Sequence, residues 1–231
     1  MSMARKGPHV PAAVLFDMDG TLIDSEHLWL MAEQSVMTSL GGEWTDADQA
    51  HCLGGPLERV ATYMVSSVGS SRSAESVGMD LMDEVEHLMR REPVTWRPGA
   101  RELLAETVAL AVPTALVTAS WRRLVQTLHE RMSTDIGVDP FTVIVPGDEV
   151  ARSKPHPDPY LRAAELLSAS PRACLAVEDS PTGVSSAVAA GCNVLAVPHL
   201  AQAVFDPTVQ VVSSLQGRSL ESIWDGFTPS R

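Results

Sequence analysis

Short runs of apolar residues, each followed by polar residues, recur along this chain and predict the strands of a buried sheet. They cover residues 12–16, 114–117, 141–145, 174–177 and 194–197. Strands that are apolar at every position are typical of a parallel sheet covered by helices on both faces. Helical spacing separates the later runs, over residues 99–110, 121–132, 158–167 and 182–190. Strands that alternate with helices predict right-handed β-α-β units in a doubly wound sheet.

Between Asp24 and Arg97 the strand pattern stops and apolar residues recur at helical spacing. The stripes cover approximately residues 28–40, 57–68 and 77–89. We therefore expect an α/β fold, in which a Rossmann-like doubly wound core carries an inserted all-helical cap. The predicted domains are a core of residues 12–24 and 97–231, a cap of residues 25–96 and a flexible tail of residues 1–11.

Composition and charge are those of an ordinary soluble globular protein. The 231 residues are 45% hydrophobic and 20% charged, and the formal net charge of −12 argues against binding to nucleic acid or to an anionic membrane. No apolar run approaches the ~20 residues of a spanning helix, and no signal-peptide pattern is present. The three cysteines are scattered without CxxC spacing, so neither a disulfide framework nor a zinc site is expected. We expect a cytoplasmic protein that is a monomer or a weak homodimer.

Two aspartates, Asp17 and Asp19, follow the first apolar run and are two residues apart. Asp19 with Gly20 also suits a tight hairpin turn, but a helical pattern follows instead of a partner strand. Ligands of open α/β sheets bind at the carboxyl ends of the strands, where both carboxyl groups would meet. We interpret Asp17 as a nucleophile that attacks phosphorus and Asp19 as the group that exchanges a proton with the leaving oxygen and with water.

Polar residues also follow the next runs. Thr118, Ala119 and Ser120 can form a phosphate cradle from hydroxyl and backbone N–H groups, although Ser120 could instead cap the following helix. Lys154 is one of two lysines in the chain and is flanked by prolines, which place it at a stiff start of a helix. It could be solvated, but we favour an ammonium that pairs with phosphate and with an acidic nucleophile.

Glu178 and Asp179 follow the fourth run and precede a helix, where the helix dipole also favours acidic residues. Together with Asp17 and Asp19 they would bring four carboxylates to one crevice, at about 4 kcal/mol for each close pair at intermediate dielectric. Lys154 alone cannot offset this repulsion, whereas a hard dication with oxygen ligands can. We expect Mg²⁺ held by Asp17, Asp179 and the backbone carbonyl of Asp19. Glu178 would complete the metal site, oriented toward Lys154 or a metal-bound water.

These segments resemble the four motifs of the haloacid dehalogenase-like superfamily of aspartate-nucleophile phosphotransferases. The matching segments are Asp17-x-Asp19-Gly20-Thr21, Thr118, Lys154-Pro155 and Glu178-Asp179-Ser180-x-x-Gly183. Four motifs in order at strand ends are highly specific, and the resemblance runs from about Val14 to beyond Val197. The similarity is to the helical-cap subgroup that includes β-phosphoglucomutase and phosphoglycolate phosphatase. It implies Mg²⁺ and a cap that opens and closes over the substrate.

Phosphoryl chemistry is favoured because the superfamily's dehalogenases lack the second aspartate of the first motif, which is present here as Asp19. The resemblance therefore implies a Mg²⁺-dependent phosphatase of a small phosphorylated metabolite, such as a sugar phosphate, with an aspartyl-phosphate intermediate. The alternative is a sugar-phosphate mutase like β-phosphoglucomutase. Counting without gaps, Trp29 and Leu57 occupy the positions of the cap histidine and the phosphate-gripping arginine of those mutases.

The charge of the cap also argues for hydrolysis. Residues 25–96 contain four arginines and no lysine against twelve acidic residues, a net charge of −8 that is a poor grip for a second phosphate. A signalling receiver domain has a similar acidic cluster, but its phosphorylated aspartate follows a later strand and no helical cap interrupts its first crossover. In the cap we expect Glu26 and Gly54 to contact the substrate. Gly54 and Gly55 could admit close backbone approach or form a simple interhelix turn.

Overall fold

The computed structural model describes residues 10–52, 57–199 and 205–227 of the chain. Its six strands form one parallel sheet in the order β3-β2-β1-β4-β5-β6. The strands are β1 (Ala13–Phe16), β2 (Thr114–Val117), β3 (Val143–Val145), β4 (Cys174–Glu178), β5 (Asn193–Ala196) and β6 (Gln210–Val211). The chain builds outward from β1 to β3 and then returns to place β4 on the other side of β1. This order makes the sheet doubly wound, and the predicted fold class is confirmed.

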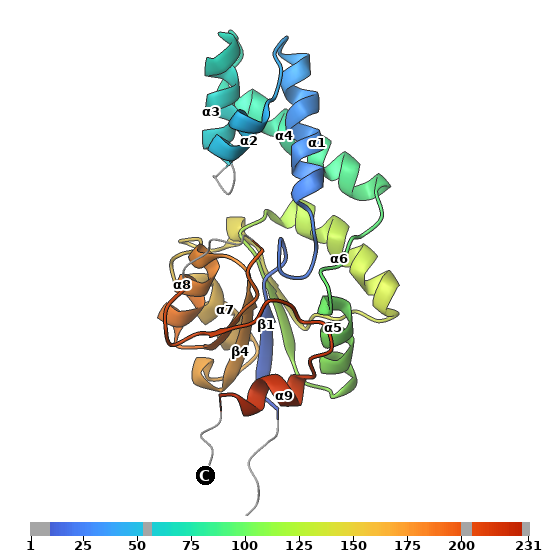
Figure 1. The fold of residues 1–231 in the computed structure, drawn as a ribbon, viewed down its shortest axis with the longest axis vertical. Helices are drawn as coiled ribbons and strands as arrows, with labels where there is room; N and C mark the ends of the chain where they lie inside the picture. Colours follow the sequence, from blue (N-terminus) through green and yellow to red (C-terminus); the bar gives the residue numbers. More distant parts are fainter. Residues whose placement is uncertain (1–9, 53–56, 200–204, 228–231) are drawn as a thin grey trace, which may run out of the picture.

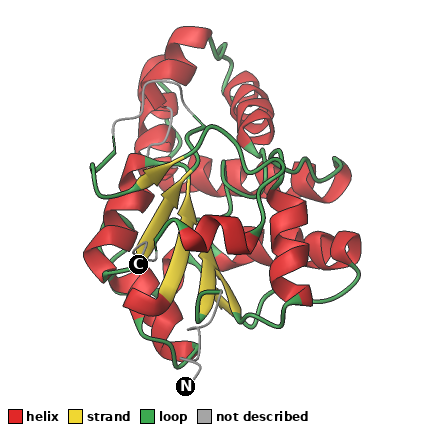
Figure 2. Cartoon of the chain, turned by 60° about the horizontal axis from the view of Figure 1, so that its bottom comes forward, coloured by secondary structure: helices red, strands yellow, loops and turns green. Residues whose placement is uncertain are grey.

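Alternate residues of the central strands face two separate cores. Val14 and Phe16 point to the side covered by α5 (Ala100–Ala109), α6 (Arg122–Ile136) and α9 (Leu220–Asp225). Ala13 and Leu15 point to the side covered by α7 (Asp158–Leu166) and α8 (Pro181–Ala190). Figure 2 shows helices on both faces of the strands. Because both faces are covered, all four residues of β1 are buried and the strand has no polar alternation.

Of the five helices described between β1 and β2, the first four form the cap, which lies beyond the carboxyl ends of the strands (Figure 1). They are α1 (Glu26–Ser39), α2 (Asp46–Cys52), α3 (Leu57–Val68) and α4 (Ala74–Arg91). The two connecting segments run side by side: Asp24 N–H donates to Thr95 O at 2.8 Å, and Arg97 N–H donates to Leu22 O at 2.8 Å. The inserted helical cap is thus present, while its exact boundaries at residues 25 and 96 stay a prediction.

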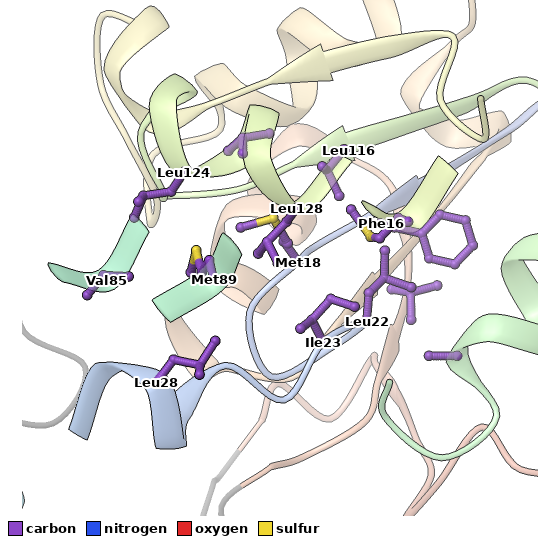
Figure 3. Close-up of a cluster of buried hydrophobic side chains, with 14 of the residues drawn as sticks. Phe16, Met18, Leu22, Ile23, Leu28, Val85, Met89, Leu116, Leu124 and Leu128 are labelled. Atoms are coloured by element: carbon purple, nitrogen blue, oxygen red, sulfur yellow. The ribbon is translucent and has the colours of Figure 1, made fainter. Parts of the chain in front are cut away.

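The cap packs on the core through one continuous apolar cluster. Figure 3 shows Leu28 of α1 and Met89 of α4 beside Leu128 of α6 and Met18, the residue that follows Asp17. Polar contacts extend the same interface, since Arg123 of α6 pairs with Asp83 at 2.6 Å and also with Glu86 of α4. The cap is therefore held to the core along α4 and α6.

Two helices and one strand are among the short elements that the sequence analysis missed. These are α2, β6 and α9, which are too short or too polar to show a hydrophobic period. The third strand also begins later than the apolar run at 141–145, because Phe141 is buried outside the ladder and its N–H donates to Asp139. Most of the predicted tail lies outside the described residues. In the part of the chain that the structure describes, no helix has the length and apolar character needed to cross a membrane.

Gly99, at the start of α5, provides a test of the core packing. Its φ is +83°, and a Cβ there would lie 2.2 Å from the backbone carbonyl carbon of Leu215. We expect Gly99→Ala to lower the free energy of unfolding by about 3 kcal/mol, because backbone strain and a backbone clash act together. Gly137→Ala is the matched control, with a φ of +88° and no atom within 4 Å of its Cβ, so strain alone should cost about 1 kcal/mol. Urea unfolding measures both, and equal losses would contradict the clash.

Candidate active site

A buried ammonium joins two of the predicted carboxylates. Lys154 Nζ donates to Asp17 Oδ1 at 2.7 Å, to Glu178 Oε1 at 2.6 Å and to Val117 O at 2.9 Å. The side chains of all three charged residues are less than a tenth exposed. Burial lowers the pKa of Lys154, but the charges of Asp17 and Glu178 more than offset this effect and raise it. The ammonium therefore stays charged and ties together the carboxyl ends of β1, β2 and β4.

Tyr160 of α7 contacts both Glu178 and Lys154. The sequence analysis did not single it out. Its hydroxyl donates to Glu178 Oε1 at 2.6 Å, and Lys154 Nζ lies 5.3 Å from the centre of its ring. Burial and the nearby carboxylates raise the pKa of Tyr160, so it remains a donor. The available signal was a tyrosine on the apolar face of a helix close to Lys154, since a buried tyrosine hydroxyl needs a partner.

Asp19 lies in a separate hydrogen-bonding environment. Ser25 Oγ donates to its Oδ1 at 2.6 Å, and Ser120 Oγ donates to its Oδ2 at 2.6 Å. Thr118 Oγ1 lies 3.4 Å from the same Oδ2. Burial raises the pKa of Asp19, and the two serine hydrogen bonds oppose this rise only in part. A carboxyl group in this setting can carry a proton, which suits an acid–base role.

The hydroxyl of Ser120 therefore faces the crevice and does not cap a helix. The residue that precedes α6 is Trp121, and it makes no side-chain cap. Ser120 N–H donates to Thr118 Oγ1 at 3.0 Å, so the segment 118–120 is folded back on itself around Asp19. Ala119 lies exposed between these two residues. Ser25, which the sequence analysis missed, completes this environment from the cap side.

Three carboxylates lie close enough to bind one metal ion. Ligand oxygens of Asp17, Glu178 and Asp179 all lie within 4.8 Å of one another. Burial, followed by the charges of Asp17 and Glu178, raises the pKa of Asp179 to about 8. Gly20 admits this approach, because its φ is +82° and a Cβ would lie 2.3 Å from Asp179 Oδ2. Oxygen donors that repel one another at this distance fit a hard dication such as Mg²⁺.

The cap reaches the crevice at Glu26, the first residue of α1. Glu26 Oε2 lies 2.5 Å from Nε2 of His199, which follows β5 in the core. The sequence analysis missed His199, although its place after an apolar run matches that of the other site residues. Glu26 thus lies where cap and core meet, while its contact with a substrate stays a prediction. Gly54, the other cap residue predicted to contact substrate, lies outside the described residues.

A further acidic residue of α1, Glu33, is buried in the cap with a relative exposure of 6%. Within the described part of the chain, its Oε2 has no hydrogen-bond partner. Burial raises the pKa of Glu33 to about 7; the nearby Trp44 opposes the rise, and the charge of Glu26 adds to it. The sequence analysis read α1 only as a weak apolar stripe and gave Glu33 no role.

Comparison with known proteins identifies a family that matches the four motifs, the parallel sheet and the helical cap. The family model described as haloacid dehalogenase-like hydrolase matches residues 14–197. The chain belongs to this family. Hexitol phosphatase A of Escherichia coli is 32% identical to it over 194 residues, which are 79% of this chain and 81% of that protein. A probable pseudouridine-5'-phosphatase of Drosophila melanogaster is 32% identical over 218 residues, which are 92% of this chain and 94% of that protein.

A solved structure extends this similarity to the whole fold. CbbY from Rhodobacter sphaeroides in complex with phosphate superimposes with a TM-score of 0.78 at 25% identity, covering 92% of this chain and 98% of the other. The predicted membership of the family and the predicted fold, cap included, are therefore confirmed.

Glu33 makes stability depend on pH. Its pKa is about 7 in the folded protein instead of 4.5, so the folded state holds the proton more tightly and loses stability as pH rises from 4.5 through 7. This increase in pKa lowers the free energy of unfolding by about 3 kcal/mol at pH 8. Glu33→Gln cannot ionise, so we expect the variant to gain about this much over the wild type between pH 4.5 and pH 8.

Urea unfolding of both proteins at several pH values measures this gain. Glu43→Gln, the same change at an exposed residue of the cap, serves as control and should show no such trend. A difference between wild type and Glu33→Gln that does not change with pH would contradict the raised pKa.

Proposed function

We propose that this protein is a Mg²⁺-dependent phosphatase that hydrolyses a small phosphorylated metabolite through an aspartyl phosphate on Asp17. As predicted, the chain is a phosphoric monoester hydrolase of its family, to which the named phosphatases also belong. The observation that carries the finer proposal is the position of Asp17. Its carboxylate lies at the end of a central strand, bonded to Lys154 and within 4.8 Å of the oxygens of Glu178 and Asp179.

The residues present can carry out the reaction in two steps. In the first, an Asp17 carboxylate oxygen attacks phosphorus and the bond to the leaving oxygen breaks, while the Asp19 carboxyl gives that oxygen its proton. In the second, the Asp19 carboxylate takes a proton from a water molecule that attacks the aspartyl phosphate, which releases inorganic phosphate and restores Asp17. Lys154 holds the nucleophile in place, and Thr118, Ser120 and the backbone at Ala119 orient the phosphate.

The oxygen donors at the site would hold Mg²⁺. Asp17 and Asp179 would supply carboxylate ligands and Asp19 its backbone carbonyl, because the Asp19 carboxyl is engaged by Ser25 and Ser120. Glu178, fixed by Lys154 and Tyr160, would orient these ligands. When bound, the ion offsets the negative charge of the nucleophile and of the transferred phosphoryl group.

The substrate is proposed to be a sugar or polyol phosphate. The names of the relatives, a hexitol phosphatase and a pseudouridine-5'-phosphatase, both refer to phosphate esters of hydroxylated molecules. Glu26 and Gly54 remain the predicted contacts in the cap. A cytoplasmic location, a monomer or weak homodimer, and the absence of nucleic-acid or membrane partners also remain predictions.

A mutase of the β-phosphoglucomutase kind is less well supported, because the net charge of −8 on residues 25–96 would repel a second phosphate. Arg59, one of the four arginines of the cap, is held within the cap, since its Nη2 donates to the carbonyls of His51 at 3.4 Å and Cys52 at 3.2 Å. Conversion of a sugar 1-phosphate into its 6-phosphate, dependent on a bisphosphate primer, would favour the mutase instead.

Removal of the nucleophile should abolish turnover. We expect Asp17→Asn to reduce phosphate release from the best ester in a broad metabolite panel by at least about 1,000-fold, since an amide cannot form the covalent intermediate. Its circular dichroism should match the wild type. Asp46→Asn, the same change at an exposed cap residue, should keep full activity. Substantial turnover by Asp17→Asn would exclude Asp17 as nucleophile.

Removal of the metal should have a similar effect. We expect EDTA to stop phosphate release and Mg²⁺ to restore it, because the charges of the carboxylates and the phosphate would otherwise repel one another. In Asp179→Asn, the Mg²⁺ concentration for half-maximal activity should rise about 10-fold to 100-fold, as expected when a metal site is weakened. Activity that survives complete chelation would contradict the metal dependence.

A further inference from the structure

One side of α1 runs from the catalytic crevice into the cap. Ser25, which precedes the helix, bonds to Asp19, and Glu26 contacts His199 of the core. Glu33 lies seven residues after Glu26, almost two full helical turns, so it projects from the same side of α1 about 10 Å further along the axis. The two carboxyl groups also influence each other electrically. Glu33 thus lies on the same side of α1 as Glu26 and further into the cap.

The surroundings of Glu33 leave one of its oxygens without a partner. Its neighbours include Trp44 and Cys52, which are 6% and 2% exposed. Cys52 ends α2 and directly precedes the segment that contains Gly54. Oε2 of Glu33 is buried and accepts no hydrogen bond from the described residues.

The arginines of the cap do not neutralise Glu33 in the described structure. Arg72 pairs with Asp80 and Arg90 with Glu86. Arg59 bonds to backbone carbonyls, and Arg91 contacts His87. A buried carboxyl group with no cation and an unused acceptor is costly to keep. Such a group is well suited to a ligand that brings a neutral donor, and unsuited to a second phosphate, which would repel it.

We propose that Glu33 is a specificity-determining residue whose free carboxyl oxygen accepts a hydrogen bond from a hydroxyl group of the substrate. The proposal rests on the proposed function, since the phosphate of the same molecule must lie at Asp17. It narrows the substrate class to phosphate esters whose remaining part is uncharged and carries several hydroxyl groups. That part of the substrate would lie along Glu26 and Glu33. A purely structural Glu33 would instead affect every substrate to the same degree.

The test compares two substrates in two variants. Sorbitol 6-phosphate carries hydroxyl groups and phenyl phosphate carries none, yet both present the same phosphate to Asp17. We expect Glu33→Gln, which keeps one weaker acceptor, to raise the KM for sorbitol 6-phosphate about 5-fold, and Glu33→Leu about 30-fold, in line with the loss of a hydrogen bond to a charged group. For phenyl phosphate, kcat and KM should change by less than about 2-fold in both variants.

Glu43→Gln is the matched control and should leave both substrates unaffected, because Glu43 is an exposed residue of the same cap. Normal turnover of phenyl phosphate by the Glu33 variants would show that their catalytic centre is intact. Equal losses on the two substrates, or no change on sorbitol 6-phosphate in Glu33→Leu, would overturn the role of Glu33 while leaving the phosphatase in place. A wild type that releases phosphate from neither ester nor from a metabolite panel would instead contradict the proposed function itself.

Discussion

The ammonium of Lys154 lies buried between Asp17 and Glu178, and the rest of the catalytic centre is arranged around this contact. These three residues come from distant parts of the chain, and their side chains meet because β1 and β4 are neighbours in the sheet. Without the ammonium, two carboxylates would face each other in a medium of low dielectric, with a third from Asp179 nearby. Loss of one partner from a buried ion pair is strongly destabilising, typically by about 3–5 kcal/mol. The same contact thus serves both the fold and the chemistry.

Asp19 lies apart from this ionic group although it is only two residues from Asp17. Its carboxyl group faces hydroxyls from the cap connection and from the segment after β2, in place of cations. Two carboxyl groups on adjacent parts of one loop therefore have different surroundings. Asp17 lies beside the ammonium of Lys154, whereas burial raises the pKa of Asp19 and favours its protonated form. This difference is what a nucleophile and a proton donor in one site require.

The sequence predicted most of the strands and singled out the acidic residues that the structure brings together, because both depend on local patterns. A buried parallel strand such as β4 is apolar throughout, and the residue types at its end are readable without knowledge of their neighbours. Ser25, Tyr160, His199 and Glu33 were missed for a physical reason. The surroundings of each form only by tertiary packing, and serine, tyrosine, histidine and glutamate are common on helices and loops that have no function. The substrate contacts in the cap are therefore much harder to predict than the phosphate site.

The paired connections of the cap have a consequence for how such a molecule can change over evolution. The two segments that connect the cap to the core, residues 22–24 and 95–97, are hydrogen-bonded to each other. The cap is therefore inserted into the core at a single point. An element whose two ends are neighbours can be lengthened, shortened or exchanged for another without altering the order of the strands. One hydrolytic scaffold can in this way acquire new recognition modules, while the ancestral chemistry beneath them is inherited unchanged.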